Sequence, residues 1–174
     1  FITIWDTENS GVTNDDQIKI PGTGTNYTVE WEEVGNPSNS GTLTATDAAT
    51  VTFPNPGLYR VKISGDFTRI HFGSSSGGDA DKIVDIDQWG DIQWSTMEEA
   101  LTRPSFNEAP SNLDISAQDT PDLSYVTNMS AMFLNASSLT ASGSSISQWD
   151  VASVGECQAQ IKSCHCLHVV YFLH

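Results

Sequence analysis

Strict alternation of apolar and polar residues in the first part of the chain is the feature that most constrains its fold. Such a period of two places one side-chain set on a buried face and the other in solvent, as a half-buried antiparallel strand requires. Gly, Pro, Asn and Asp residues separate the alternating segments and predict turns. Short strands at this spacing predict an all-β sandwich over residues 1–72. The alternating segments are residues 1–5, 17–20, 27–31, 41–44, 50–53, 59–63 and 67–72.

A Gly- and Ser-rich stretch follows the alternating region. Residues 73–79 read GSSSGGD, a composition typical of a flexible connection. We therefore expect residues 73–81 to be a linker between two domains.

A strand-like and a helix-like segment then recur together. Residues 83–89 alternate as a strand. Residues 94–101 carry apolar residues at helical spacing, and Ser95 and Glu98 fit a capping box at the start of the predicted helix. The same pair returns at 113–116 and 126–133. A third copy begins at residues 145–154, so equivalent positions such as Trp94, Val126 and Val154 lie at offsets of 32 and 28.

Repetition at this period is typical of a stacked array in which each unit buries its apolar face against the next. We expect an α/β solenoid over residues 82–154, made of about three units with the last incomplete, a small parallel sheet on one side and helices on the other. A single α/β domain whose helices resemble each other by chance is the alternative.

Residues 126–139 (VTNMSAMFLNASSL) and 146–154 (ISQWDVASV) resemble the BspA-like bacterial surface leucine-rich repeat. The resemblance spans about residues 82–154 and is most specific in the second half, although Leu139 stands where the repeat usually has Phe. It implies a leucine-rich-repeat-like solenoid in a protein that binds partners at a cell surface.

The region before the linker is similar to a PKD-type immunoglobulin-like domain. Residues 27–31 (YTVEW) and 56–63 (PGLYRVKI) match the motif strands of that family, but Glu32 and Glu33 replace its usual Gly-Asp turn. The fold expected for the whole chain is therefore mixed: an immunoglobulin-like β-sandwich followed by a short α/β solenoid.

The chain is strongly acidic, with a formal net charge of −15 from 22 acidic and 7 basic residues. This charge repels phosphate backbones and anionic membrane surfaces, so nucleic acid is not an expected partner. No apolar run reaches the 18 residues of a membrane span. Acidity of this kind often serves solubility alone, and an acidic patch for cations or a basic partner is the alternative.

The last twenty residues, 155–174, depart from the repeat and form an atypical tail. All three cysteines lie there, at 157, 164 and 166, together with three of the four histidines. We expect a truncated or out-of-frame end. Zinc binding by Cys157, Cys164, Cys166, His165 and His168 is the alternative, although the pairings of common zinc modules are incomplete.

Other candidate chemistry is weak, so we expect neither an enzyme nor a cofactor or metal site. No Ser-His-Asp set or phosphate-binding Gly loop has a recognisable context. The carboxylates of Asp79, Asp81, Asp85 and Asp87 lack the spacing of an EF-hand, so we expect them to be solvated on the surface. A calcium site is the alternative. Trp89 and Trp149 recur at equivalent strand ends, so we expect them to pack between repeats. Stacking against a sugar is the alternative.

We therefore expect an exported, cell-surface or extracellular protein that mediates adhesion or binds a protein or glycan through its repeats. A carbohydrate-binding accessory module of an exported glycoside-active protein is the second hypothesis, and an enzyme with an unfamiliar site is the third. A truncated solenoid end would expose its core, so self-association through residues 145–174 is an artefact that we expect of it. The candidate contact residues are the outward members of the repeat strands: Asp85, Asp87, Asp114, Ser116, Ser145 and Ser147.

Overall fold

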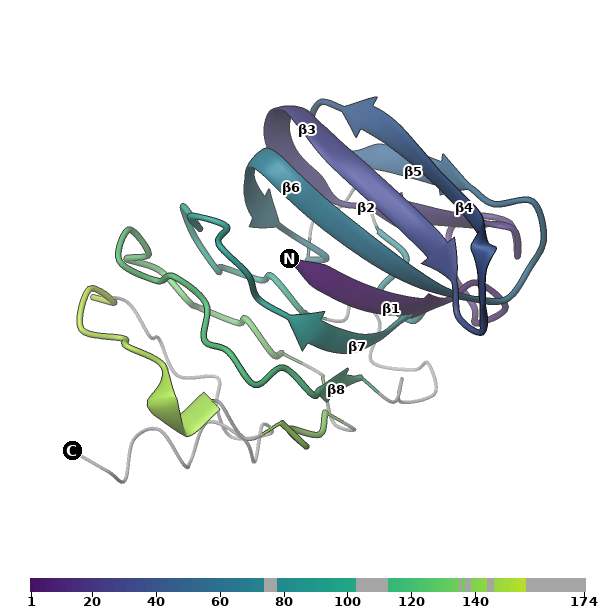
Figure 1. Cartoon of the computed structure of the whole chain (residues 1–174). Coiled ribbons are helices and arrows are strands. Elements are labelled where there is room, and N and C mark those ends of the chain that lie inside the picture. The colour runs from purple at the N-terminus through teal and green to yellow at the C-terminus, as the bar shows by residue number, and fades with distance from the viewer. Residues whose placement is uncertain (74–77, 103–112, 135, 137–138, 144–145, 156–174) are drawn as a thin grey trace.

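The computed structural model of the chain describes residues 1–73, 78–102, 113–134, 136, 139–143 and 146–155. These residues are almost all in strands, turns and extended segments, with one short 3-10 turn, η1 (Ile146–Gln148). Figure 1 shows one curved sheet in front of a smaller one, with stacked loops of chain continuing below.

The larger sheet has six strands in the order β4-β3-β6-β1-β7-β8. All neighbours pair antiparallel except β7 and β8, which are parallel. Its strands are β1 (Ile2–Asp6), β3 (Gly22–Glu33), β4 (Asn36–Ala45), β6 (Leu58–Ile70), β7 (Ile83–Gln88) and β8 (Asp114–Ile115). The second sheet pairs β2 (Gln17–Ile20) with β5 (Ala49–Thr52) and lies behind the first in Figure 1.

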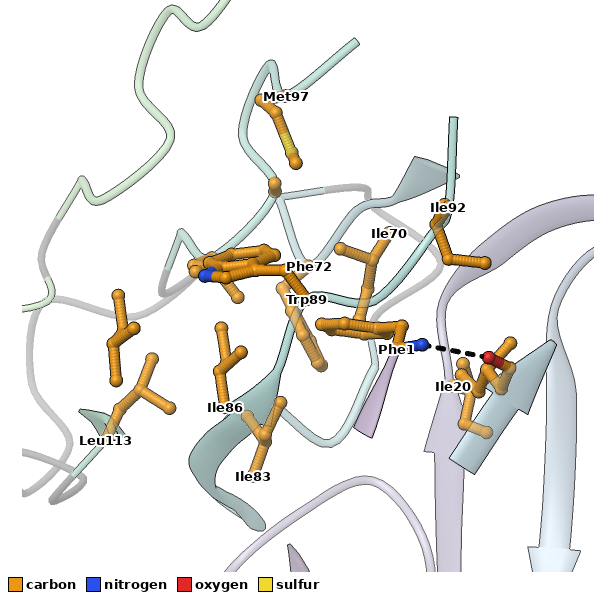
Figure 2. Packing of buried hydrophobic residues seen from close by; sticks show 14 of the residues in the cluster. Phe1, Ile20, Ile70, Phe72, Ile83, Ile86, Trp89, Ile92, Met97 and Leu113 are labelled. Atoms are coloured by element: carbon orange, nitrogen blue, oxygen red, sulfur yellow. Dashed lines mark hydrogen bonds between the residues drawn. The ribbon is translucent and has the colours of Figure 1, made fainter. Parts of the chain in front are cut away.

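The predicted strands of residues 1–72 are therefore present, and their alternation sets the direction of each side chain. In β3, Tyr27 and Val29 are buried, while Thr28 and Glu30 between them are more exposed. The inward residues form one continuous apolar core that extends from β1 into the C-terminal half. Figure 2 shows this junction, where the rings of Phe1 and Trp89 stack with 5.7 Å between their centroids.

The described part of the expected linker, residues 78–81, packs against the sheets. Asp79 is buried and accepts hydrogen bonds from the backbone N–H groups of Val12 (2.6 Å) and Lys19 (2.5 Å). The fully buried Lys82 donates its ammonium hydrogens to the carbonyl oxygens of Asn14 (2.7 Å) and Gln17 (3.0 Å). These two side chains bond the loop between β1 and β2 to the segment that leads into β7.

The C-terminal half stacks successive segments in parallel. We call them layer 1 (residues 83–102), layer 2 (113–134) and layer 3 (139–143 and 146–155). Layers 1 and 2 pair in register at Ile86 and Ile115, and again at Gln93 and Asp122. Further along, the N–H of Met97, Glu99 and Leu101 donates to the carbonyl of Asn128, Ser130 and Met132 respectively.

The predicted mixed fold with an α/β solenoid is wrong, because the described residues are nearly all β and contain no α-helix. The segments expected as helices, 94–101 and 126–133, are turns and extended chain. Backbone donors such as Met97 N–H bond to the neighbouring layer and not to a carbonyl one helical turn earlier. Glu99 and Ala131 also have positive φ, of 51° and 55°, which an α-helix does not tolerate.

The expected capping box is wrong for the same reason. The Ser95 hydroxyl donates to the carbonyl of Thr68 on β6, and the N–H of Glu98 is accepted by Thr96 at 3.2 Å. Layer 3 also differs from the expectation. The third unit was expected to add a strand to the parallel sheet, but Ile146 lies in η1. Thr140 instead lies next to β8, where its N–H donates to the carbonyl of Leu113.

Candidate binding face of the six-stranded sheet

The outer face of the six-stranded sheet, on the side away from β2 and β5, carries a cluster of ion-paired charged side chains. Alternation places Glu30 and Glu32 of β3 and Arg60 and Lys62 of β6 on this face, because their sequence neighbours point into the core. Asp87 of β7 lies on the same face. We call these five residues the charged face.

Ion pairs connect the strands of the charged face. Lys62 Nζ lies 2.7 Å from Glu30 Oε2, and Arg60 lies 3.9 Å from Glu32 and 3.1 Å from Asp87. Since β1 lies between β6 and β7, the Arg60 side chain crosses β1 to reach Asp87. Each pair is about half exposed, so we expect it to contribute less than about 1 kcal/mol to stability. The pairs order the side chains more than they stabilise the fold.

An open hollow of about 460 Å³ lies over this face. Acidic, basic and hydroxyl side chains line it, so it presents donors and acceptors side by side. Its lining residues are Glu30, Trp31, Glu32, Ser40, Gly41, Thr42, Arg60 and Lys62.

A ladder of carboxylates continues the same face onto β7 and β8. Asp85 accepts the N–H and hydroxyl of Ser116 in the next layer, at 3.0 and 2.6 Å. Asp114 repeats this contact one layer further, accepting the N–H of Ser142 at 3.0 Å and its hydroxyl as well. Each carboxylate therefore bonds its own layer to the following one.

The two carboxylates of the ladder have opposite pKa shifts. Burial raises the pKa of Asp85 above its ordinary 3.8, and the charge of neighbouring Asp114 adds to the rise, although the Ser116 hydrogen bonds oppose it. Burial alone would also raise the pKa of Asp114, but hydrogen bonds led by those from Ser142 outweigh it, so that pKa lies below 3.8. Of the two ladder carboxylates, Asp85 is thus the one that takes up a proton more readily.

The predicted contact residues fall into two groups. Asp85, Asp114 and Ser116 lie together in the ladder, and Asp87 belongs to the charged face through Arg60. Ser147 is exposed but lies in η1, away from any strand, and Ser145 lies outside the described residues. That these residues bind a partner stays a prediction.

The alternatives for metal binding gain no support from the part of the chain that is described. Asp79 and Asp85 accept bonds from different partners, and no group of three or more His, Cys, Asp or Glu side chains gathers within the described ranges. The five cysteines and histidines considered for zinc lie outside those ranges.

Trp89 and Trp149 pack between layers, as the packing interpretation predicts. Both are buried, and their rings meet edge to face at 5.2 Å. Trp31 is only partly buried, and its ring packs on Phe53 and Tyr59 on the inner side of the sheet.

The sequence analysis missed Glu30, Glu32, Arg60 and Lys62 as site residues. The signal was present, because each is an outward member of an alternating strand, as Asp85 is. The two halves share one sheet, in which β1 lies between β6 and β7. This arrangement brings together residues that are far apart in the sequence, and local patterns could not predict it.

Residues 97–168 match a protein family described as "Mycoplasma protein of unknown function, DUF285". The match covers layer 2 and layer 3 and extends into the tail that we expected to be atypical. No curated protein and no solved structure matches the chain. Within the described residues there is no helix with the length and hydropathy needed to cross a bilayer.

Proposed function

We propose that this chain is a non-enzymatic binding module of a bacterial cell-surface or secreted protein, and that it binds a protein or glycan through the charged face. The observation that carries the proposal is the open hollow over β3, β4 and β6, lined by acidic and basic side chains that ion pairs already hold in place. Side chains ordered before binding lose less entropy when a partner docks.

The electrostatics favour a polar, uncharged or mixed-charge partner. Glu30 and Glu32 stand opposite Lys62 and Arg60, so the hollow carries both signs of charge in a fixed pattern. Such patterns select a partner by complementarity more than they add affinity. The net charge of −15 argues against nucleic acid, as composition indicated.

The cell-surface location rests on sequence likeness. Residues 126–139 and 146–154 resemble BspA-like surface repeats, and residues 27–31 and 56–63 resemble PKD-type motifs. The family match at 97–168 supports the repeat likeness at the level of a bacterial family. Adhesion is the role that these likenesses suggest for the charged face.

A charge-neutral pair of substitutions tests the proposal. Arg60→Gln with Asp87→Asn removes the ion pair that crosses β1 and leaves the net charge unchanged. Binding to panels of purified extracellular matrix proteins and glycans should fall by about tenfold for any partner that the wild-type chain binds.

The matched control is Arg69→Gln with Glu98→Gln, which removes an ion pair of 3.5 Å elsewhere on the molecule. Circular dichroism checks that both variants remain folded. Equal binding by the Arg60/Asp87 variant and the wild type would exclude the charged face as the site.

One observation favours the carbohydrate-binding alternative. The partly exposed indole ring of Trp31 lies against Gly41 on the inner side of β4, and a partly exposed aromatic ring is a surface on which a sugar can stack. Trp31→Ala should then abolish glycan binding and leave protein binding in place. Retention of glycan binding by this variant would reject the alternative.

A further inference from the structure

The outer edge of the six-stranded sheet at β4 is open. β4 pairs with β3 on one side, and among the described residues no strand pairs with its other side. All of its residues are exposed or partly exposed. An unpaired edge presents a row of backbone N–H and C=O groups that another strand can bond.

β4 lacks the features, such as charged side chains, that usually prevent another strand from pairing with an open edge. Residues 36–45 contain no Lys, Arg, Asp or Glu, and Pro37 is confined to the start of the strand. Irregular pairing is also confined to that end, at Glu32 and Glu33 of β3. Residues 40–45 therefore form a regular, uncharged edge.

The inner side of this edge offers an aromatic surface. A Cβ on Gly41 would lie 2.6 Å from Cζ2 of Trp31, so only glycine lets the indole ring lie against β4. The ring packs edge to face on Phe53 (5.2 Å) and Tyr59 (5.7 Å), which hold it in position. Partly buried Leu43 lies on the same side as Gly41.

The outer side of the edge offers acids within reach. Ser40 and Thr42 are short and exposed, and their β3 partners Glu32 and Glu30 are about half exposed. An added strand would lie two strand spacings from β3, or about 10 Å. A Lys or Arg side chain on it can pass over Ser40 or Thr42 toward the carboxylates of the hollow.

We propose that the β4 edge binds an extended segment of another protein, added as a seventh strand, with basic residues on its outer side and apolar residues on its inner side. This inference rests on the proposed binding role and names the chemistry of one partner. Charge complementarity selects this occupant, because the chain carries −15 overall and the half-exposed Glu30 and Glu32 lie on the strand next to β4, opposite Thr42 and Ser40. A second copy of β4 has no basic residue to offer.

The test uses the full chain labelled with ¹⁵N and a nine-residue synthetic peptide in which lysine and valine alternate. Expected are chemical-shift changes confined to the amides of residues 40–45 and the indole N–H of Trp31, with slower amide exchange in β4. The same peptide with glutamate for lysine, or with a central proline, should bind at least about tenfold more weakly, since it loses charge complementarity or a backbone donor.

Two lysine substitutions separate the edge from general charge effects. Thr42→Lys places a like charge at the edge and should weaken peptide binding by at least about tenfold. Thr50→Lys adds the same charge at an exposed position of β5 and should leave binding unchanged.

Four outcomes would overturn the proposal. They are shifts confined to the ladder at Asp85 and Asp114, equal binding of the glutamate or proline peptide, no binding of the lysine peptide, and a concentration-dependent dimer that Thr42→Lys abolishes. The last would make a second copy the occupant. None of them affects the Arg60/Asp87 comparison, so failure here is distinguishable from failure of the proposed function.

Discussion

At the scale of single residues, several acidic side chains stabilise turns by accepting hydrogen bonds from backbone N–H groups. Asp119 of layer 2 accepts the N–H groups of Trp89 and Gly90 in layer 1, at 3.0 and 2.8 Å. Asp122 and Asp150 each accept the N–H two residues ahead, the geometry of an Asx turn. Part of the acidic composition therefore stabilises the turns and bonds the layers to each other.

Lys82 should be the basic residue with the largest effect on stability among those described. Its ammonium group is fully buried and donates to the carbonyl oxygens of Thr13, Asn14 and Gln17, and Lys82→Met removes all of these charge-assisted hydrogen bonds. We expect a loss of about 3 kcal/mol in the free energy of unfolding, measured by urea denaturation.

Lys62→Met is the matched control, because Lys62 is half exposed and pairs only on the surface with Glu30. Its cost should stay below about 1 kcal/mol. Equal urea midpoints for the two variants would show that the buried contacts of Lys82 do not stabilise the fold.

The ladder carboxylates should depend on pH in opposite ways. Asp85 holds its proton more tightly when folded, so its contribution to stability decreases as pH rises above 3.8. Asp114 has a lowered pKa, so its contribution is present above 3.8 and is lost as pH falls through the folded value. Carboxyl ¹³C NMR should show Asp85 titrating at higher pH than Asp114.

Amide substitutions give the same contrast at neutral pH. Asp114→Asn should lower the urea midpoint at pH 7, and Asp85→Asn should lower it less or raise it, because only Asp114 gains from being charged when folded. Alanine at either position should also lower stability, because it removes the hydrogen bonds to Ser116 or Ser142.

At the scale of elements, the pairing of β3 with β4 depends on one glycine. Gly41→Ala would place a methyl group 2.6 Å from the Trp31 ring, which Phe53 and Tyr59 prevent from moving freely. We expect a destabilisation of about 1–3 kcal/mol in chemical denaturation, the usual cost of overpacking. Gly155→Ala, which meets no atom within 4 Å, should change the midpoint little.

Elements whose partners are local could be predicted from the sequence. Residues 27–31 and 59–63 alternate so regularly that both strands and their buried faces followed. The segment 94–101 was wrongly predicted as a helix, because apolar residues three positions apart fit a helix and also a series of turns within one layer. Its Met97 and Leu101 donors are satisfied by layer 2, a choice that depends on residues about thirty positions away.

The same limit applied to the site. Alternation along β7 identified Asp85 and Asp87 as outward, and the structure brings both to the outer face. Alternation alone could not predict that β1 lies between β6 and β7, or that Arg60 of β6 donates a hydrogen bond across it to Asp87. Candidate residues were thus predictable one strand at a time, but their assembly was not.

At the scale of the whole molecule, the sheet and core run without a break across the expected boundary at residues 73–81. β1 pairs with β6 before the boundary and with β7 after it. Phe1 packs on both Trp89 (5.7 Å) and Trp94 (5.1 Å) in layer 1. Neither half can bury these apolar surfaces alone.

Residues 1–102 should therefore unfold as one cooperative unit. Separate domains would give two transitions, whereas a shared sheet ties the loss of β7 to the exposure of β1 and of Phe1. Urea curves from tryptophan fluorescence and far-ultraviolet circular dichroism should coincide, and the most protected amides in hydrogen exchange should include both β6 and β7. A fragment of residues 1–72 should expose β1 on one side and melt well below the full chain. If that fragment instead retained the midpoint of the full chain, the boundary would separate two independent domains, and the ion pair from Arg60 to Asp87 would bridge bodies that fold apart.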